Sequence, residues 1–411
     1  QWVVLSYMLV VTSLMLMVAR LGDMFGKRKV FIWGQVLFTL GSLLCGLAPG
    51  VHSLIAFRAL QGVGAAMSQA LGVAIITETV HPSMRGRAIG LIGATVSVGL
   101  SLGPSIGGMI IGLVGWRWIF FINVPVGLFS LWVLTRKVAD VSKPSGGQHF
   151  DYIGAVLSFL VMAAYALGMT WGQESGFGHP VVLGLLGTSF VGLLAFLVTE
   201  KRMAQPMIDL KLFSNPLLSL NLLMGVLVFV VGASNFILPF FLQYGKGYSV
   251  QQVGLMIMAI PLCMGLMAPL AGSLSDRYGS RWICIAGLAL MSVGCLAMGN
   301  MRMETGTVEF VARCIPMGLG FGLFQAPNNS AIMGQAPKAQ LGVVSGLLNY
   351  SRVIGQTSGL PLVGALFASF VMARETLASR TDFSMADPGV LLQGVNRTYQ
   401  SLFLLVLVVL G

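Results

Sequence analysis

The chain has 411 residues, of which 56% are hydrophobic and only 9% are charged. Soluble proteins carry about 25% charged residues, so this composition excludes an ordinary soluble domain and indicates a polytopic, all-α membrane protein. The net charge of +11 does not indicate nucleic-acid binding, because membrane proteins concentrate Lys and Arg in their cytoplasmic loops.

Apolar runs long enough to cross a membrane recur along the whole chain. We expect thirteen spans, at 1–19, 30–48, 54–77, 86–114, 119–135, 152–171, 181–199, 217–241, 251–274, 283–299, 308–332, 341–372 and 398–411. One set of alternate loops carries fifteen Lys and Arg residues, and the other set carries six. The first set is therefore expected to be cytoplasmic, in a multi-pass membrane protein.

The first loop motif occurs twice. Leu21-Gly-Asp23-Met-Phe-Gly26-Lys-Arg28 is similar to Leu274-Ser-Asp276-Arg-Tyr-Gly279-Ser-Arg281. The glycine allows a sharp turn, and the carboxylate can cap a neighbouring helix N-terminus or pair with an arginine. We interpret both copies as a cytoplasmic gating latch, formed by Asp23, Gly26, Arg28, Asp276, Gly279 and Arg281.

The repeat extends beyond the loop, since Arg58 and Arg313 also match at nearly the same offset. Two helix bundles of similar plan are expected, related by an axis along the membrane normal. Spans 152–171 and 181–199 belong to neither copy. The predicted division is 1–140 for the first bundle, 141–212 for two inserted spans with their linkers, and 213–411 for the second bundle.

The fourth run contains a stripe of small residues, Gly99, Gly103, Gly107 and Gly108, around Pro104. Small residues four apart let two helix backbones approach closely in lipid, and a proline allows the helix to bend. We expect this helix to be a moving part that packs against another helix. A static packing face is the alternative.

Polar residues inside the runs are expensive in hydrocarbon and normally face a partner or a watery cavity. Arg352 lies near the middle of its run, whereas Arg58 lies near the end of its run, so its side chain can also reach the interface. The candidate substrate-binding residues are Tyr7, Gln69, Asn235, Phe236, Gln325, Asn329 and Arg352. Each of these taken alone can equally well be a polar contact between helices.

No acidic residue lies at the middle of a run, although proton-driven transporters usually hold a titratable carboxylate in the membrane. The five cysteines are interpreted as buried apolar residues. No cofactor or metal site is predicted, and the absence of a nucleophile–base pair argues against an enzyme.

By these motifs the chain resembles the major facilitator superfamily, and within it the fourteen-span drug:proton antiporters. Residues 20–29 resemble the superfamily loop motif, and Arg58, Gln61 and Gly62 resemble the motif tied to proton coupling. Residues 99–108 match the antiporter motif, and Trp116 to Pro125 resemble the segment that follows it. The resemblance implies two six-helix bundles with two extra spans, and a first span with the acidic motif that is absent before Gln1.

The resemblance also implies a location in the cell inner (plasma) membrane and rocker-switch alternating access, with the glycine helix sealing the outer contact between the bundles. The expected function is export of hydrophobic or cationic drugs in exchange for protons, by a monomer that contacts membrane lipids. One alternative is an exporter of an endogenous lipid, metabolite or siderophore, in which Arg58 and Arg352 hold an anionic group. Another alternative is a membrane protein that does not transport.

Overall fold

The computed structural model describes residues 2–137, 150–203, 205–373 and 386–410, apart from the side chains of Pro104, Ser105 and Glu174. Within these ranges every regular element is helical, as predicted. The helices of the first part of the chain are α1 (Trp2–Phe25), α2 (Lys27–Leu47), α3 (Val51–Thr79), α4 (Arg85–Val114), α5 (Trp118–Phe121), α6 (Asn123–Lys137), α7 (Tyr152–Ser175) and α8 (Pro180–Arg202). The helices of the second part are α9 (Pro216–Gly232), α10 (Leu238–Phe240), α11 (Val250–Ile257), α12 (Ala259–Tyr278), α13 (Ser280–Met298), α14 (Thr307–Gly334), α15 (Leu341–Met372) and α16 (Pro388–Leu410).

Twelve helical stretches of the described residues are long and apolar enough to cross a membrane. They correspond to the first twelve predicted runs. The thirteenth run, predicted at 398–411, lies in α16, which begins ten residues earlier, at Pro388. Its first half carries Gln393, Asn396 and Arg397. These polar residues lower the hydropathy of the helix, so the sequence pattern missed its beginning.

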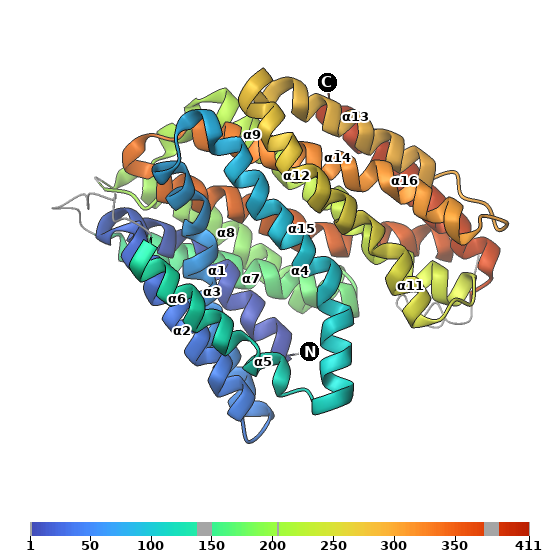
Figure 1. Cartoon of the computed structure of the whole chain (residues 1–411), viewed down its shortest axis with the longest axis horizontal. Coiled ribbons are helices and arrows are strands. Elements are labelled where there is room, and N and C mark those ends of the chain that lie inside the picture. Colours follow the sequence, from blue (N-terminus) through green and yellow to red (C-terminus); the bar gives the residue numbers. More distant parts are fainter. Residues whose placement is uncertain (1, 138–149, 204, 374–385, 411) are drawn as a thin grey trace.

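The helices form two groups that converge at one end and diverge at the other. In Figure 1, α1, α2, α3 and α6 lie at the lower left, and α12, α13, α14 and α16 lie at the upper right. The groups meet at the upper left of this view. The chain reversals after α1 and after α12, which carry the two loop motifs, lie at this convergent end.

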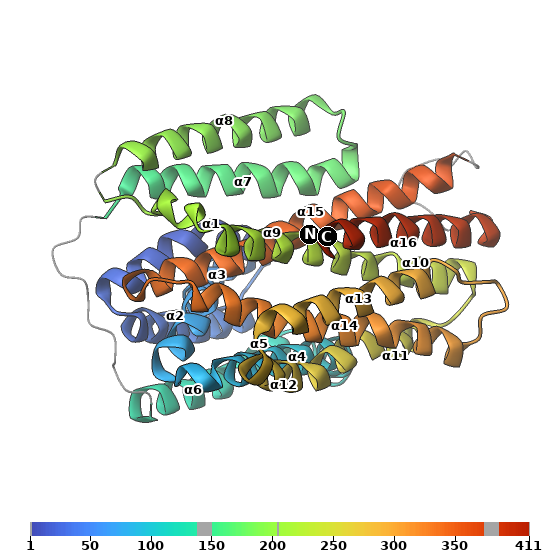
Figure 2. The same ribbon diagram turned by 90° about the horizontal axis from the view of Figure 1, so that it is seen from above.

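The two helices that belong to neither sequence repeat form a separate antiparallel pair. Figure 2 shows α7 and α8 side by side on one flank, with α7 against the rest of the molecule. Helix α7 packs on α1 and α15, and α8 packs mainly on α7. The predicted boundary between the first bundle and this pair, at residue 140, lies outside the described residues.

Several predicted spans contain a break. The run 217–241 is interrupted after α9 by a 3-10 turn at Ala233–Phe236, and a π-helical turn follows at Phe241–Gly245. Pro239 follows the 3-10 turn and supplies no backbone N–H for a regular helix. The run 251–274 divides into α11 and α12 at Met258, and the run 119–135 divides at Ile122.

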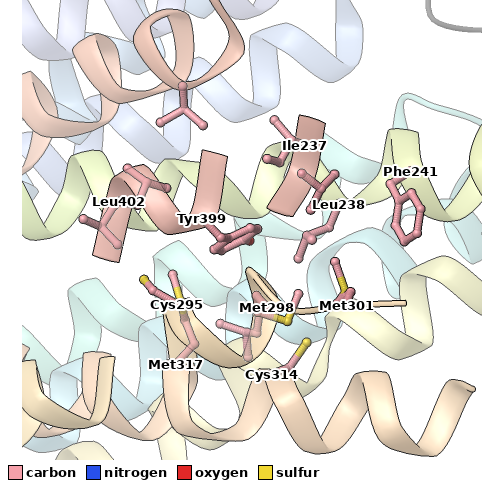
Figure 3. Close-up of a cluster of buried hydrophobic side chains, with 14 of the residues drawn as sticks. Ile237, Leu238, Phe241, Cys295, Met298, Met301, Cys314, Met317, Tyr399 and Leu402 are labelled. Atoms are coloured by element: carbon pink, nitrogen blue, oxygen red, sulfur yellow. The ribbon is translucent and has the colours of Figure 1, made fainter. Parts of the chain in front are cut away.

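An apolar core holds the broken segment in place (Figure 3). Leu238 and Phe241 lie within it, together with Cys295 and Met298 of α13 and with Tyr399 of α16, whose exposed fraction is 0%. The core thereby fixes the segment that carries exposed Phe236 and partly buried Phe240, which line a cavity together with α15 and the end of α7.

Candidate functional site

The convergent end is closed by two helix caps that repeat the same geometry. The carboxylate of Asp23, at the end of α1, accepts hydrogen bonds from the backbone N–H groups of Gly342 and Val343, each at 2.8 Å. The carboxylate of Asp276, at the end of α12, accepts from Gly86 at 2.8 Å and from Arg87 at 2.9 Å. The acceptors are carboxylates and the donors are the free N–H groups at the first turns of α15 and α4, where a negative charge is stabilised.

Both caps join an element of the first sequence repeat to an element of the second. Helix α1 caps α15, and α12 caps α4. The sequence left open whether these acids cap a helix or pair with an arginine, and the structure shows the cap. In each case glycine is the second residue of the capped helix: a Cβ on Gly342 would lie 2.7 Å from Asp23 Oδ1, and one on Gly86 would lie 2.6 Å from Asp276 Oδ1. The close approach therefore requires glycine at both positions.

The predicted arginine partners lie elsewhere. Arg28 donates to the carbonyl oxygens of Leu134 and Thr135, at the end of α6, at 3.2 and 3.1 Å. Arg281 is exposed and lies over the ring of Trp282. The cation that meets Asp23 is Lys27, at 3.2 Å, and Lys27 also lies 3.5 Å from Glu78.

The glycines that end α1 and α12 behave as predicted. Gly26 has φ +101° and Gly279 has φ +85°, a region that glycine adopts without a steric penalty. Each lets the chain reverse directly after the capping acid and begin the next helix.

Near the divergent end, Arg58 is held in a small polar network. Its Nε donates to the carbonyl oxygen of Val3 at 3.0 Å, and its Nη1 donates to Gln61 Oε1 at 2.7 Å. Gln61, which is 2% exposed, donates in turn to Ser42 Oγ at 2.7 Å. The guanidinium lies over the ring of Tyr7, 4.1 Å from its centroid. The network thus ties α3 to both α1 and α2.

The matching arginine of the second repeat is neutralised differently. Arg313 forms an ion pair with Glu309 at 2.6 Å and donates to the carbonyl oxygens of Ala297 and Asn300. Arg58 makes no ion pair with an acid among the described residues. Close packing supports this part of the site, because a Cβ on Gly62 would lie 3.0 Å from the carbonyl oxygen of Tyr7.

Helix α4, which carries the glycine stripe, packs tightly on α12 in its convergent half. A Cβ on Gly90 would meet Ala268 and Pro269 of α12, and one on Gly93 would lie 3.3 Å from Ala268 Cβ. From Gly99 onward the surroundings change: apart from the neighbouring backbone of the helix itself, no heavy atom lies within 4 Å of the Cβ positions of Gly99, Gly103, Gly107 or Gly108. The predicted outer seal is therefore not formed in this conformation. The side chain of Pro104 lies outside what is described.

The structure does not bring the seven candidate substrate residues into one pocket. Tyr7 lies under Arg58, and the side chain of Gln69 is exposed. Arg352 lies over Phe229, 5.2 Å from its centroid, and its Nε is buried without a hydrogen-bond partner. Gln325 and Asn235 each bury a side-chain oxygen that has no hydrogen-bond donor, and Asn329 is 8% exposed.

Phe236 lies in a cavity of about 570 Å³ between α7, α10 and α15. Its wall also includes Phe177, Phe240 and Pro361, with Gln173 as a polar member. Phe236 and Phe240 meet edge to face, with centroids 5.5 Å apart. Sequence reasoning missed Gln173 and Phe177, because the inserted helices carry no repeat motif that would mark them.

Comparisons with known proteins agree with this architecture. The profile of the Major Facilitator Superfamily matches residues 1–360 and, in a second alignment, residues 220–409. Riboflavin transporter RibZ of Clostridioides difficile is 33% identical over 93% of this chain and 82% of its own length. Multidrug resistance protein Stp of Mycobacterium tuberculosis is 31% identical over 94% of this chain and 72% of its own length.

Solved structures show the same fold at low sequence identity. The human organic anion transporter MFSD10 aligns with a TM-score of 0.66 at 15% identity, over 98% of this chain and 83% of its own. The proton:xylose symporter XylE aligns with a TM-score of 0.64 at 14% identity, over 98% of this chain and 84% of its own. Together, the paired caps, the converging helix groups and the family match show that the chain belongs to the Major Facilitator Superfamily of membrane transporters.

Proposed function

We propose that this transporter is a proton-coupled antiporter that exports hydrophobic or cationic drugs by rocker-switch alternating access. The observation that carries the proposal is the pair of caps, because both of them join the two helix groups at the same end. Loop charge assigns this end to the cytoplasm. The conformation is then outward-facing, and breaking both caps would permit the opposite, inward-facing conformation.

Helix caps are suitable contacts for such a switch. A hydrogen bond to a charged group contributes about 1.5–3 kcal/mol, which is large enough to bias a two-state equilibrium and small enough to be broken in each cycle. We propose Asp23, Gly26, Asp276 and Gly279 as the latch residues. Arg28 and Arg281 are assigned to its surroundings, since neither contacts the capping carboxylates.

For proton coupling we propose Arg58, with Gln61 and Gly62 as the residues that hold it. A guanidinium without an acidic partner favours the ionised form of any carboxylate that approaches it, and so promotes proton release. The contrast with Arg313, which Glu309 neutralises, supports a special role for Arg58.

For substrate binding we propose the aromatic cavity that contains Phe236. Ligand pockets of transporters and enzymes are mostly apolar with few polar groups, and this wall has that composition. Aromatic rings provide large contact areas to flat hydrophobic compounds and also attract cations.

The test is ethidium efflux from cells that produce the protein, with and without a protonophore. The proposal predicts faster efflux than in cells without the protein, and loss of this difference when the protonophore is added. Proton-independent export would contradict the coupling, and the absence of export by correctly inserted protein would contradict drug transport.

A second candidate is export of a metabolite with a planar or anionic group. One observation favours it: Arg352 is buried over Phe229, and Phe229 meets Phe321 at a centroid distance of 5.2 Å, with no ion pair to Arg352 among the described residues. A cation beside aromatic rings suits a flat, electron-rich ligand. The relationship to a riboflavin transporter is compatible with this candidate. Riboflavin release that requires Arg352, in cells that do not export ethidium, would favour it over drug export.

A further inference from the structure

Two buried carboxyl groups meet where the inserted helix pair ends at the convergent side. Asp151 precedes α7, and its Oδ1 accepts from the N–H of Gly154 at 2.8 Å. Glu200 lies in the last turn of α8, and its Oε2 accepts from the N–H of Ile208 at 3.0 Å. The residues are only 3% and 2% exposed. Each carboxyl group thus has one satisfied oxygen.

The two remaining oxygens face the same space. Asp151 Oδ2 and Glu200 Oε1 are buried, and neither has a hydrogen-bond donor. Each lies 2.5 Å from the point that a Cβ on Gly154 would occupy, so they are separated by at most twice that distance. Two ionised carboxylates this close in a buried position repel each other. A proton on one of them removes a charge and supplies the missing donor.

Three other acids of the described chain have partners that stabilise their negative charge. Asp23 receives two backbone N–H groups and Lys27, Asp276 receives two backbone N–H groups, and Glu309 pairs with Arg313. The Asp151–Glu200 pair is the place where two buried carboxyl groups each keep an oxygen without a donor.

The surrounding cations neutralise the pair incompletely. Arg20 of α1, which is 8% exposed, lies close enough to act electrostatically on Glu200. It forms no ion pair within 4.0 Å with either acid in the described chain. Lys201 and Arg202, in the same turn as Glu200, are exposed to solvent. One cation against two carboxylates leaves one negative charge for a proton to remove.

We propose that Asp151 and Glu200 hold one proton between them and form a proton-binding site at the convergent end of the inserted helix pair. Arg20 lies three residues before Asp23 on the same helix, so release of the proton strengthens the attraction on the helix that carries the first cap. This effect on the cap makes the acid pair the place where a transported proton leaves the protein. That part of the proposal rests on the proposed proton-coupled function.

The binding of the proton is testable without transport. Infrared spectroscopy of the purified protein distinguishes a protonated carboxyl group from a carboxylate. At about pH 7, where an isolated Asp or Glu is ionised, we expect a protonated carboxyl band in the wild type. The band should disappear in Glu200→Gln and in Asp151→Asn, because either change leaves a single ionised acid. Asp209→Asn, which alters an exposed capping acid nearby, should retain it.

Circular dichroism and size-exclusion chromatography establish whether each variant is folded. Where a variant does not fold, titration of the wild type replaces it, and the band must then disappear over a single transition as the pH is raised. A wild type without the band, or a band that persists in both variants, would overturn the site. A protein with the band but without proton-driven export would keep the site and reject the proposed function. Proton-driven export by a protein without the band would keep the proposed function and reject the site.

Discussion

Asp23 and Asp276 make the same contact in the two halves of the molecule, but in different surroundings. Asp23 is 4% exposed and has Lys27 beside it, whereas Asp276 is partly exposed and forms no ion pair among the described residues. The electrostatic contribution of a buried pair is screened less than that of an exposed one. The charge interactions of the first cap are therefore screened less by solvent than those of the second.

We predict that Asp23→Asn weakens the closed end and impairs export. The change keeps the shape of the side chain. It removes the charge from the acceptor of two hydrogen bonds and abolishes the ion pair between Asp23 and Lys27. A loss of about 1.5–3 kcal/mol shifts the population by about tenfold to about a hundredfold. Spin labels on exposed Lys29 and Lys338, in a cysteine-free background, measure the distance between the groups at this end.

The control for this prediction is the second copy. Asp276→Asn should shift the same distance distribution less, and Asp209→Asn, which caps only a short 3-10 turn, should not shift it. Equal distributions for Asp23→Asn and the wild type would show that the cap does not hold this end closed.

Arg58 leads to a prediction about the geometry of its side chain. Arg58→Lys preserves the charge. A lysine ammonium lacks the planar guanidinium geometry by which Arg58 donates to Val3 and Gln61 at the same time. We expect the initial rate of proton-driven efflux to fall at least about tenfold, given about 1.5–3 kcal/mol for a hydrogen bond of a charged group. Arg313→Lys is the matched control and should change the rate much less. Wild-type efflux by Arg58→Lys would remove Arg58 from the coupling site.

At the residue scale, the sequence predicts where the functional side chains lie better than it predicts which residues they contact. The duplicated motif located both capping acids, because a carboxylate before a turn glycine has few possible roles. It did not identify Lys27 as the partner of Asp23, since Arg28 follows directly after Lys27 and carries the same charge. The pairing of Asp151 with Glu200 was not predicted either, because 49 residues separate them and only the packing of α7 on α8 brings them together.

At the scale of elements, α4 is divided into two halves with different roles. The half near Gly90 packs tightly on α12, whereas the half from Gly99 onward has no neighbour within 4 Å of its glycine Cβ positions. In the proposed alternating access, the open half approaches another helix when the closed end separates. The proposal therefore assigns the glycines to a conformation other than this one.

We therefore predict that Gly103→Leu abolishes export and leaves folding and insertion intact. The larger side chain has space in this conformation but obstructs close helix contact in the opposite one. Gly184→Leu on α8 is the control, because Gly184 is also exposed and without neighbours. Efflux rates at equal membrane levels of both variants measure the effect. Full transport by Gly103→Leu would contradict the interpretation of this stripe as a moving contact.

Helix positions were predictable from hydropathy, except where a helix begins with polar residues. The α7 helix begins at the predicted residue, 152, because a clear apolar run starts there. The beginning of α16 was missed because its first half is polar. Asn396 exchanges hydrogen bonds with the backbone of Met301, and Gln400 donates to Gly299, so these side chains serve tertiary packing.

At the scale of the whole molecule, the proposed alternating access requires two conformations, and the structure shows one of them. In that proposal the same sequence closes the end with the caps and, at another stage, the end with the glycine stripe. Pattern analysis predicted both contacts together, because it does not separate contacts that form at different times. The open glycine stripe is therefore the counterpart of the two formed caps.

The measurement that tests the central claim most directly is ethidium uptake into proteoliposomes that contain only this protein, driven by an imposed pH gradient. Sidedness is read from protease access to one end. The account predicts uptake that follows the direction and size of the gradient, with proton movement in the opposite direction, and its loss in Asp23→Asn. Ethidium uptake that is indifferent to the gradient, or no uptake by protein that is shown to be inserted and folded, would contradict it.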